Sequence, residues 1–142
     1  MKQVIPSEHT QNLSACDYES FVLAGKAHFT AICELTNHKF FFFVRKRKGT
    51  TNMYNVYVWD GAWQHIAFYN SSTHILQVYT ANTQHRNALK AIFAFHAAPE
   101  WLTLQHQNCC PRCGRVLTKN IHGFGEKCWK KTLKELKKIE RN

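Results

Sequence analysis

The chain has 142 residues and is strongly basic, with 19 Lys and Arg against nine Asp and Glu and a formal net charge of +10. Its ten Phe, five Tyr and four Trp supply enough apolar surface for a core without disulfides. The longest apolar run, Phe40 to Val44, is far shorter than the roughly 20 residues needed to cross a bilayer. The sequence therefore excludes a transmembrane helix and predicts no membrane partner.

Residues 1–18 are polar, and we expect them to form an irregular tail. They contain no apolar signal segment, so we expect a cytoplasmic protein whose cysteines stay reduced. After this tail, alternate apolar residues from Ala27 to Leu35 show the period of two that is typical of a half-buried strand. A tight turn at 37–38 leads into residues 39–47, which predict the second strand of a hairpin.

Three more strands are expected before the chain becomes helical, within residues 54–59, 64–69 and 74–80. Between residues 83 and 97 the apolar side chains fall on one helical face, and Pro99 prevents the helix from extending further. That face consists of Ala88, Leu89, Ile92, Phe93 and His96. A last strand is expected at 101–105. Residues 19–104 therefore predict an α+β domain, an antiparallel β-sheet with one packing helix.

The segment after this strand has the ligand spacing of a zinc site. Cys110 and Cys113 form a CxxC pair, and Gly114 lets the backbone fold beneath the two thiolates, as in a zinc knuckle. His106 and Cys128 would complete the four ligands that a structural zinc needs. The alternatives are a disulfide, a thioredoxin-like redox pair or unrelated buried thiols, and the reducing compartment that we expect favours metal over a disulfide.

Two neighbouring residues leave the ligand set open. Cys109 could replace Cys110, although three residues would then lie between the paired cysteines. His122 could replace His106, because it lies in a turn between the CxxC pair and the last cysteine of the chain. The knuckle spacing favours Cys110, and of the two histidines we favour His106.

These positions resemble the C-terminal module of a family of small phage and prophage proteins of unknown function. That module has a His-x3-Cys-x2-Cys-Gly-Arg-x-Leu-Thr run, a Gly-x-Gly turn and a final cysteine. The matching residues are His106, Cys110, Cys113, Gly114, Arg115, Leu117, Thr118, Gly123, Gly125 and Cys128. Upstream, Ala24 to Thr30 (AGKAHFT) is similar to a strand signature of the family. The resemblance implies a zinc module and, for a phage protein, the cytoplasm of the host cell. The chain departs from the family in a shorter link between Thr118 and Gly123, and at His122 and Glu126, where serine and proline are usual.

A basic helix is predicted to follow the metal ligands at residues 126–141. Its apolar stripe consists of Trp129, Leu133, Leu136 and Ile139. Gly125 just before the helix and Glu126 in its first turn suit a helix start. Together the zinc knuckle and this helix form a small C-terminal module, which we expect to span residues 105–142.

Positive charge is concentrated in two segments. Ten Lys and Arg residues but only three acidic residues lie between Arg112 and Asn142, and Arg45 to Lys48 form a second cluster. Such clusters favour polyanions, because they steer them and release counterions from phosphates. For any single lysine a solvated surface position is the alternative. The residues predicted to contact nucleic acid or an acidic protein are Arg45, Lys46, Arg47, Lys48, Arg112, Arg115, Lys130, Lys131, Lys134, Lys137 and Lys138.

Aromatic residues give a further indication. Six of them lie on neighbouring predicted strands near the basic cluster, namely Tyr54, Tyr57, Trp59, Trp63, Phe68 and Tyr69. Exposed rings beside basic residues can stack single-stranded bases. Strand alternation also places Val56, Val58 and Ile66 among them, so we expect most of these rings to belong to the core.

Together these features favour a nucleic-acid-binding zinc protein over an enzyme. The alternative is an inhibitor of a host defence protein, anti-CRISPR-like in action, that binds an acidic or nucleic-acid-binding protein surface. This alternative depends on analogy with the phage family. A small nuclease is less favoured, because the acidic residues are scattered and four soft ligands would close the zinc site to substrate.

Overall fold

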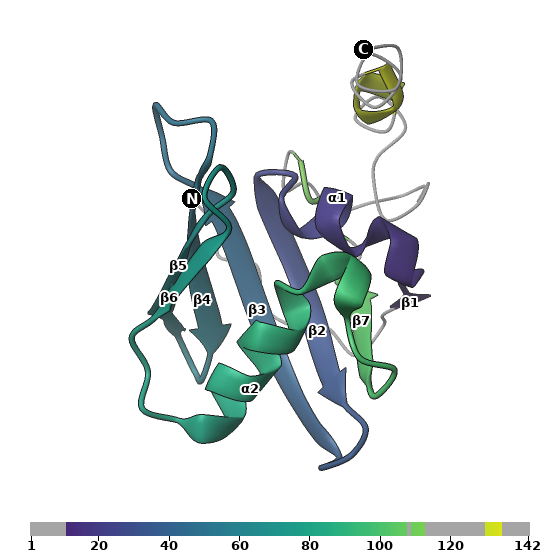
Figure 1. The fold of residues 1–142 in the computed structure, drawn as a ribbon, viewed down its shortest axis with the longest axis vertical. Coiled ribbons are helices and arrows are strands. Elements are labelled where there is room, and N and C mark those ends of the chain that lie inside the picture. Colours follow the sequence, from purple (N-terminus) through teal and green to yellow (C-terminus); the bar gives the residue numbers. More distant parts are fainter. Residues whose placement is uncertain (1–10, 108, 113–129, 135–142) are drawn as a thin grey trace.

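Five consecutive strands form the centre of the computed structural model, which describes residues 11–107, 109–112 and 130–134 (Figure 1). Each strand pairs antiparallel with the next, and each closely matches a strand that the sequence predicts. The strands are β2 (Lys26–Cys33), β3 (His38–Lys46), β4 (Met53–Trp59), β5 (Trp63–Asn70) and β6 (Ile75–Val78). The fold is therefore α+β, with an antiparallel sheet, as predicted.

A helix returns the chain from β6 to the other side of β2. This helix, α2 (Thr83–Ile92), begins after Asn82, whose side-chain oxygen accepts a hydrogen bond from the His85 backbone N–H at 3.0 Å. It ends before the predicted residue 97. Phe95, with a positive φ of 47°, instead begins the 3-10 turn η2 (Phe95–Ala97). The last strand, β7 (Leu102–His106), then pairs antiparallel with β2.

The segment before β2 differs from the irregular tail predicted for residues 1–18. Its described part contains three short elements, β1 (Gln11–Asn12), η1 (Ala15–Asp17) and the start of α1 (Tyr18–Val22). The Tyr18 hydroxyl donates to the Leu102 carbonyl and accepts from the Leu104 N–H, both at 3.4 Å. These elements are too short to produce a periodic sequence pattern, and β7, which holds them, lies far along the chain.

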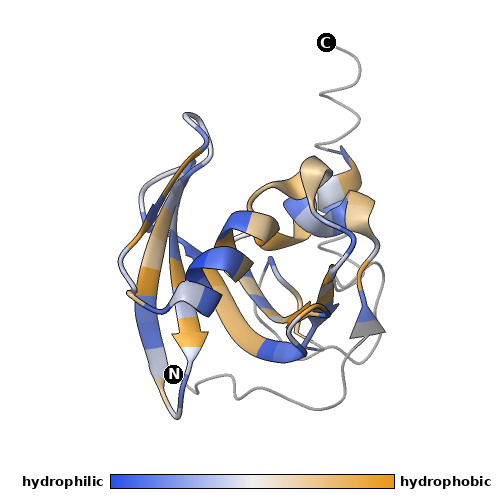
Figure 2. Ribbon diagram, turned by 60° about the horizontal axis from the view of Figure 1, so that its bottom comes forward, coloured by the Kyte–Doolittle hydropathy of each residue, from blue (hydrophilic) through white to orange (hydrophobic). Residues whose placement is uncertain are grey.

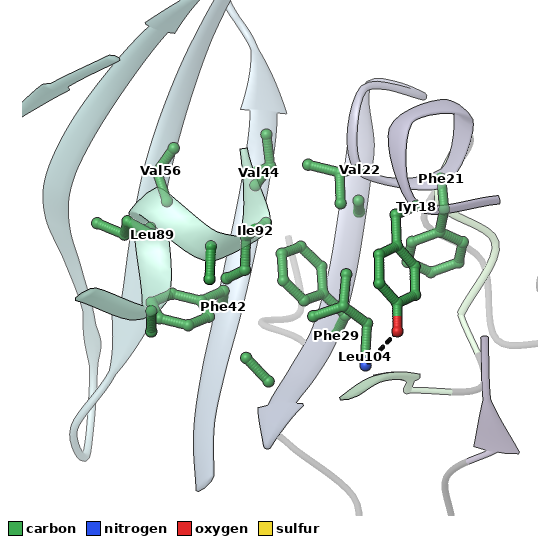
Figure 3. Close-up of a cluster of buried hydrophobic side chains, with 14 of the residues drawn as sticks. Tyr18, Phe21, Val22, Phe29, Phe42, Val44, Val56, Leu89, Ile92 and Leu104 are labelled. Atoms are coloured by element: carbon green, nitrogen blue, oxygen red, sulfur yellow. Dashed lines mark hydrogen bonds between the residues drawn. The ribbon is translucent and has the colours of Figure 1, made fainter. Parts of the chain in front are cut away.

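The complete sheet has the strand order β1-β7-β2-β3-β4-β5-β6. Helices α1 and α2 lie on one face of it, and the core lies between that face and the helices (Figure 1). Figure 2 shows hydrophobic and hydrophilic residues interleaved along the strands, because only alternate side chains point into the core. Figure 3 shows how Phe29, Phe42 and Val56 from the sheet meet Phe21 from α1 and Leu89 from α2, all at most 1% exposed.

The chain after β7 is described only in part. Arg112 Nη1 donates to Thr132 Oγ1 at 3.4 Å and so connects the segment after β7 to residues 130–134. Those residues are helical, within the helix predicted at 126–141. The rest of that helix and the predicted knuckle turn lie outside the described residues.

No helix in the described ranges of the chain is long and apolar enough to cross a membrane.

Candidate nucleic-acid interface and metal ligands

The face of the sheet opposite α2 presents a row of aromatic rings. Side chains that alternate with the core residues must point to this second face. Four of them lie opposite one another across successive strands: His28 pairs with Phe43, Phe43 with Tyr57, and Tyr57 with His65. Tyr79, just after β6, extends the row beyond β5. We call these five residues the ring row.

Neighbours in the ring row are in direct contact. The rings of His28 and Phe43 stack with centroids 4.1 Å apart and planes 5° apart. The centroid distances are 5.7 Å from Phe43 to Tyr57, 5.2 Å from Tyr57 to His65 and 5.4 Å from His65 to Tyr79. With strands about 4.8 Å apart, a row crossing four strand spacings is about 19 Å long.

A β-bulge determines which aromatic residues of β5 join this face. Val56 of β4 pairs with Ala67, whereas Tyr57 pairs with His65, so Ile66 is an extra residue in β5. Because the extra residue reverses the alternation, His65 points to the ring row and Ala67 points to the core. Trp63 therefore lies beside the ring row, with its centroid 5.9 Å from that of Phe43.

The six aromatic residues that the sequence singles out divide between the two faces. Tyr54 and Tyr69 belong to the core, at 4% and 2% exposed. The other four are half-buried and lie on the second face, namely Tyr57, Trp59, Trp63 and Phe68. The expectation that most of these rings are core residues is therefore wrong, because the bulge and the strand register place four of them on the opposite side.

A second row, of polar and basic residues, runs parallel to the ring row. It consists of the next side chains along each strand that point to the same face. In this row Lys26 pairs with Arg45, Arg45 with Asn55 and Asn55 with Phe68. Lys26 and Arg45 are exposed, and the guanidinium carbon of Arg47 lies 5.7 Å from the centroid of the Phe68 ring. The second face therefore has cations directly beside its rings.

The predicted cluster Arg45 to Lys48 does not act as one patch. Because β3 alternates, Lys46 points to the core face, where its ammonium lies 5.9 Å from the centroid of the Tyr54 ring. Lys48 is exposed in the turn that follows β3. Only Arg45 and Arg47 lie on the side of the ring row, and sequence analysis missed Lys26, which the register places beside Arg45.

The C-terminal basic segment meets the same end of the sheet. The Lys26 backbone N–H donates to the Pro111 carbonyl at 2.6 Å, so Arg112 follows directly beside the start of β2. The hydrogen bond from Arg112 to Thr132 then brings the helical residues 130–134 to this end. Lys130, Lys131 and Lys134 are exposed there, whereas the predicted contacts Arg115, Lys137 and Lys138 lie outside the described residues.

Three predicted or alternative zinc ligands are described, and all three are buried. His106 is 2% exposed, with its ring centroid 6.5 Å from that of Phe21 in α1. Cys110 is fully buried in the cluster that also contains Phe21, whereas Cys109, at 3% exposed, is buried outside that cluster. Both thiols that could pair with His106 are therefore buried.

Burial lowers the pKa of His106, so its imidazole is neutral at pH 7, the form that binds metal. The other ligands that the sequence predicts, Cys113, Cys128 and the alternate His122, lie outside the described residues. Among the residues that the structure does describe, no three His, Cys, Asp or Glu side chains are grouped to hold a metal. The described part therefore supplies two buried ligand candidates of the four that zinc requires.

His28 is an unusual member of the ring row because it is only 5% exposed. Burial lowers its pKa to about 4, and the Lys26 backbone opposes this shift only in part. Within the described chain, its Nδ1 atom is buried and has no group in hydrogen-bonding geometry. His28 is therefore a neutral ring at pH 7 and supports Phe43 rather than adding positive charge.

A cavity of about 450 Å³ lies at the opposite end of β2 and β3, next to α2. Most of the side chains around it are apolar, and Cys33 is its one thiol. Burial raises the pKa of Cys33, so this thiol stays protonated and is a poor nucleophile. Lys90 and Gln84 lie at its edge on α2, away from the ring row.

Comparisons of the chain with protein-family models, with curated proteins and with solved structures gave no match.

Proposed function

We propose that the protein binds nucleic acid through the second face of its sheet and the basic residues at one end of it. The observation that supports this most is the register that places Lys26 and Arg45 in a row beside aromatic rings, with Arg47 against Phe68. Phosphates attract such cations, and the gain comes largely from counterion release. The rings add an apolar surface that a purely solvating set of lysines does not need.

Two segments that are distant in sequence supply the charge. Lys26, Arg45 and Arg47 come from the sheet, and Arg112 comes from the segment bonded to β2. The exposed lysines of residues 130–134 extend this basic region. A net charge of +10 gives the whole molecule a field that attracts polyanions.

The proposal includes one structural zinc, held by His106, Cys110, Cys113 and Cys128. Its support is the ligand spacing together with the burial of His106, which lies beside Phe21 of α1, and of Cys110. Four bound ligands leave no open coordination position, so the metal would stabilise the C-terminal module rather than react with a substrate. We therefore propose a binding protein without catalytic activity.

Charge removal tests this function. Labelled single-stranded and double-stranded oligonucleotides would be titrated with protein at about 50 and 200 mM salt, the range in which phosphate contacts have a large effect. One variant replaces Lys26, Arg45 and Arg47 by alanine. Its control replaces three exposed cations outside this set: Lys39 at the opposite end of β3 from Arg45, and Arg86 and Lys90 of α2.

Loss of three phosphate contacts should reduce the slope of log affinity against log salt by about 2 for a single strand, at roughly 0.7 per phosphate. The control variant should lose much less. Equal losses in the two variants would show attraction by net charge alone and refute the proposed surface. If the folded parent binds no nucleic acid at low salt, the proposal fails, and an acidic protein surface becomes the next partner to test.

A further inference from the structure

We infer that the ring row is a stacking platform for single-stranded nucleic acid, so that the protein discriminates single strands from duplexes. This inference depends on the proposed function and adds the class of ligand. In a single strand the bases are free to lie flat on aromatic side chains, whereas in a duplex they are already stacked on one another.

Exposure distinguishes the ring row from a second core. Phe43, Tyr57 and Trp63 are only half-buried, His65 is exposed and Tyr79 is 58% exposed. Core residues on the opposite face of the same strands, by contrast, are almost fully buried. A connected group of partly exposed rings on one face of a sheet is a candidate binding surface.

The dimensions of the face suit a strand of nucleic acid. The ring row is about 19 Å long, and neighbouring rows of side chains on one face are about 6.6 Å apart, or two residues along a strand. Lys26 and Arg45 therefore lie within reach of the phosphates of a strand whose bases stack on Tyr57 and His65. Arg47 extends this set of cations at the Phe68 end.

Duplex recognition would need a different surface. The major groove admits a projecting helix or a two-stranded ribbon. The ring row instead lies flat across β2 to β5, with Tyr79 next to the edge strand β6, and α2 covers the other face (Figure 1). A duplex can contact the surrounding lysines but cannot place its bases on these rings.

His28 and Phe43 set one end of the platform. Their rings are 4.1 Å apart and nearly parallel, and His28 is buried beneath its neighbours rather than open to solvent. A neutral His28 supports Phe43 without attracting phosphate. The open positions for bases are therefore Tyr57, His65 and Tyr79, with Trp63 beside them.

The test compares ring removal with ring replacement. Single-stranded probes of about 12 nucleotides, within the usual range of site sizes, and duplexes of equal length would be titrated with Tyr57→Ala and Trp63→Ala. Tyr57→Phe and Trp63→Phe keep a ring at each position and control for stability. Trp101→Ala removes a half-buried indole beside the cavity at the far end of β2 and serves as the matched control.

Each alanine variant should bind the single strand roughly 5- to 150-fold more weakly, the change in affinity that corresponds to the loss of one stacked base. Duplex affinity should change little, and the Phe variants and Trp101→Ala should stay near the parent. The stacking platform would be refuted if both alanine variants bound single strands as tightly as the parent does. It would also be refuted if the parent bound duplex more tightly than single strand. In those cases the proposed function would stand. If the parent binds neither the single strand nor the duplex, the function itself is refuted.

Discussion

Four consecutive phenylalanines, Phe40 to Phe43, offer the sharpest test of the different roles of the two sheet faces, which are stability for the core face and nucleic-acid binding for the second face. Phe42 points into the core, and its neighbour Phe43 lies in the ring row. We predict that alanine at Phe42 damages stability and that alanine at Phe43 damages nucleic-acid binding. A change of one residue along β3 should therefore exchange one phenotype for the other.

The magnitude at Phe42 follows from its burial. The side chain is fully buried, its ring centroid lies 5.9 Å from that of Phe29, and α2 packs over it (Figure 3). Truncating such a phenylalanine costs about 3–5 kcal/mol of unfolding free energy through lost burial and the cavity left behind. With a urea dependence of about 2 kcal/mol per molar, the midpoint of unfolding should fall by roughly 2 M.

At Phe43 the loss should be smaller, because the ring is only half-buried. It contacts the rings of His28 and Tyr57, and aromatic pairs contribute about 0.5–1.5 kcal/mol each. We expect Phe43→Ala to cost about 1–2 kcal/mol but to weaken single-strand binding, whereas Phe43→Tyr should preserve both properties.

Urea unfolding followed by far-UV circular dichroism, together with oligonucleotide titration of each folded variant, measures both effects. A larger loss of stability in Phe43→Ala than in Phe42→Ala would refute the assignment of faces. Equal binding by Phe43→Ala and the parent would remove Phe43 from the platform.

Three further predictions concern other parts of the molecule. Elemental analysis should find one zinc per chain, lost on alanine substitution of a ligand but kept in Cys16→Ala and Cys33→Ala; the proposed ligands are His106, Cys110, Cys113 and Cys128. The lowered pKa of His28, about 4 against 6.5, gives stability that is fully present above pH 6.5 and lost as pH falls toward 4, about 3 kcal/mol between pH 7 and 4. Urea titrations of His28→Phe should lack this component. Charge reversal at Lys130, Lys134 and Lys137 of the predicted C-terminal helix should lower the affinity for nucleic acid and reduce the salt dependence of that affinity.

Each of these predictions has a contrary outcome. Zinc retained in His106→Ala but lost in His122→Ala would make His122 the fourth ligand. Parallel pH profiles for the parent and His28→Phe would contradict burial of a neutral imidazole at that position. Unchanged affinity after reversal of the three lysines would exclude the C-terminal helix from the interface.

Strand positions were largely predictable because alternation is a local property of the sequence. The period of two around Ala27 to Leu35, and the turn residues between later strands, correspond to β2 through β6. The short elements before β2 were not predictable, since Tyr18 is held by hydrogen bonds to β7 and not by a pattern of its own. The helix α2 was found, but its end at Ile92 depends on the backbone conformation of Phe95.

The candidate interface was only half predictable, because the direction of a side chain depends on register. Trp63, His65 and Tyr69 are separated by even numbers of residues, and simple alternation would place them on one face. The bulge at Ile66 instead leaves Trp63 and His65 at the ring row and sends Tyr69 into the core. No residue type in β5 marks that position, so only the pairing with β4 reveals it.

Charge clusters were subject to the same limit. Consecutive cations in a strand alternate between faces, so Lys46 is separated from Arg45 and Arg47. Lys26 is far from them in sequence and became a neighbour only through the β2–β3 pairing. The proposed zinc ligands were chosen from their spacing alone and stay a prediction, to which the structure adds only that His106 and Cys110 are buried.

Photo-crosslinking of a single-stranded oligonucleotide to the 142-residue chain, with the attached peptides identified by mass spectrometry, tests the proposed interface most directly. The expected crosslinks are to rings of the second face, above all Tyr57, Trp63 and Tyr79, and duplex competitor should displace them less than single-stranded competitor does. Crosslinks confined to Trp101, beside the cavity at the far end of β2, would contradict the interface, because that part of the fold lies away from both the rings and the cations.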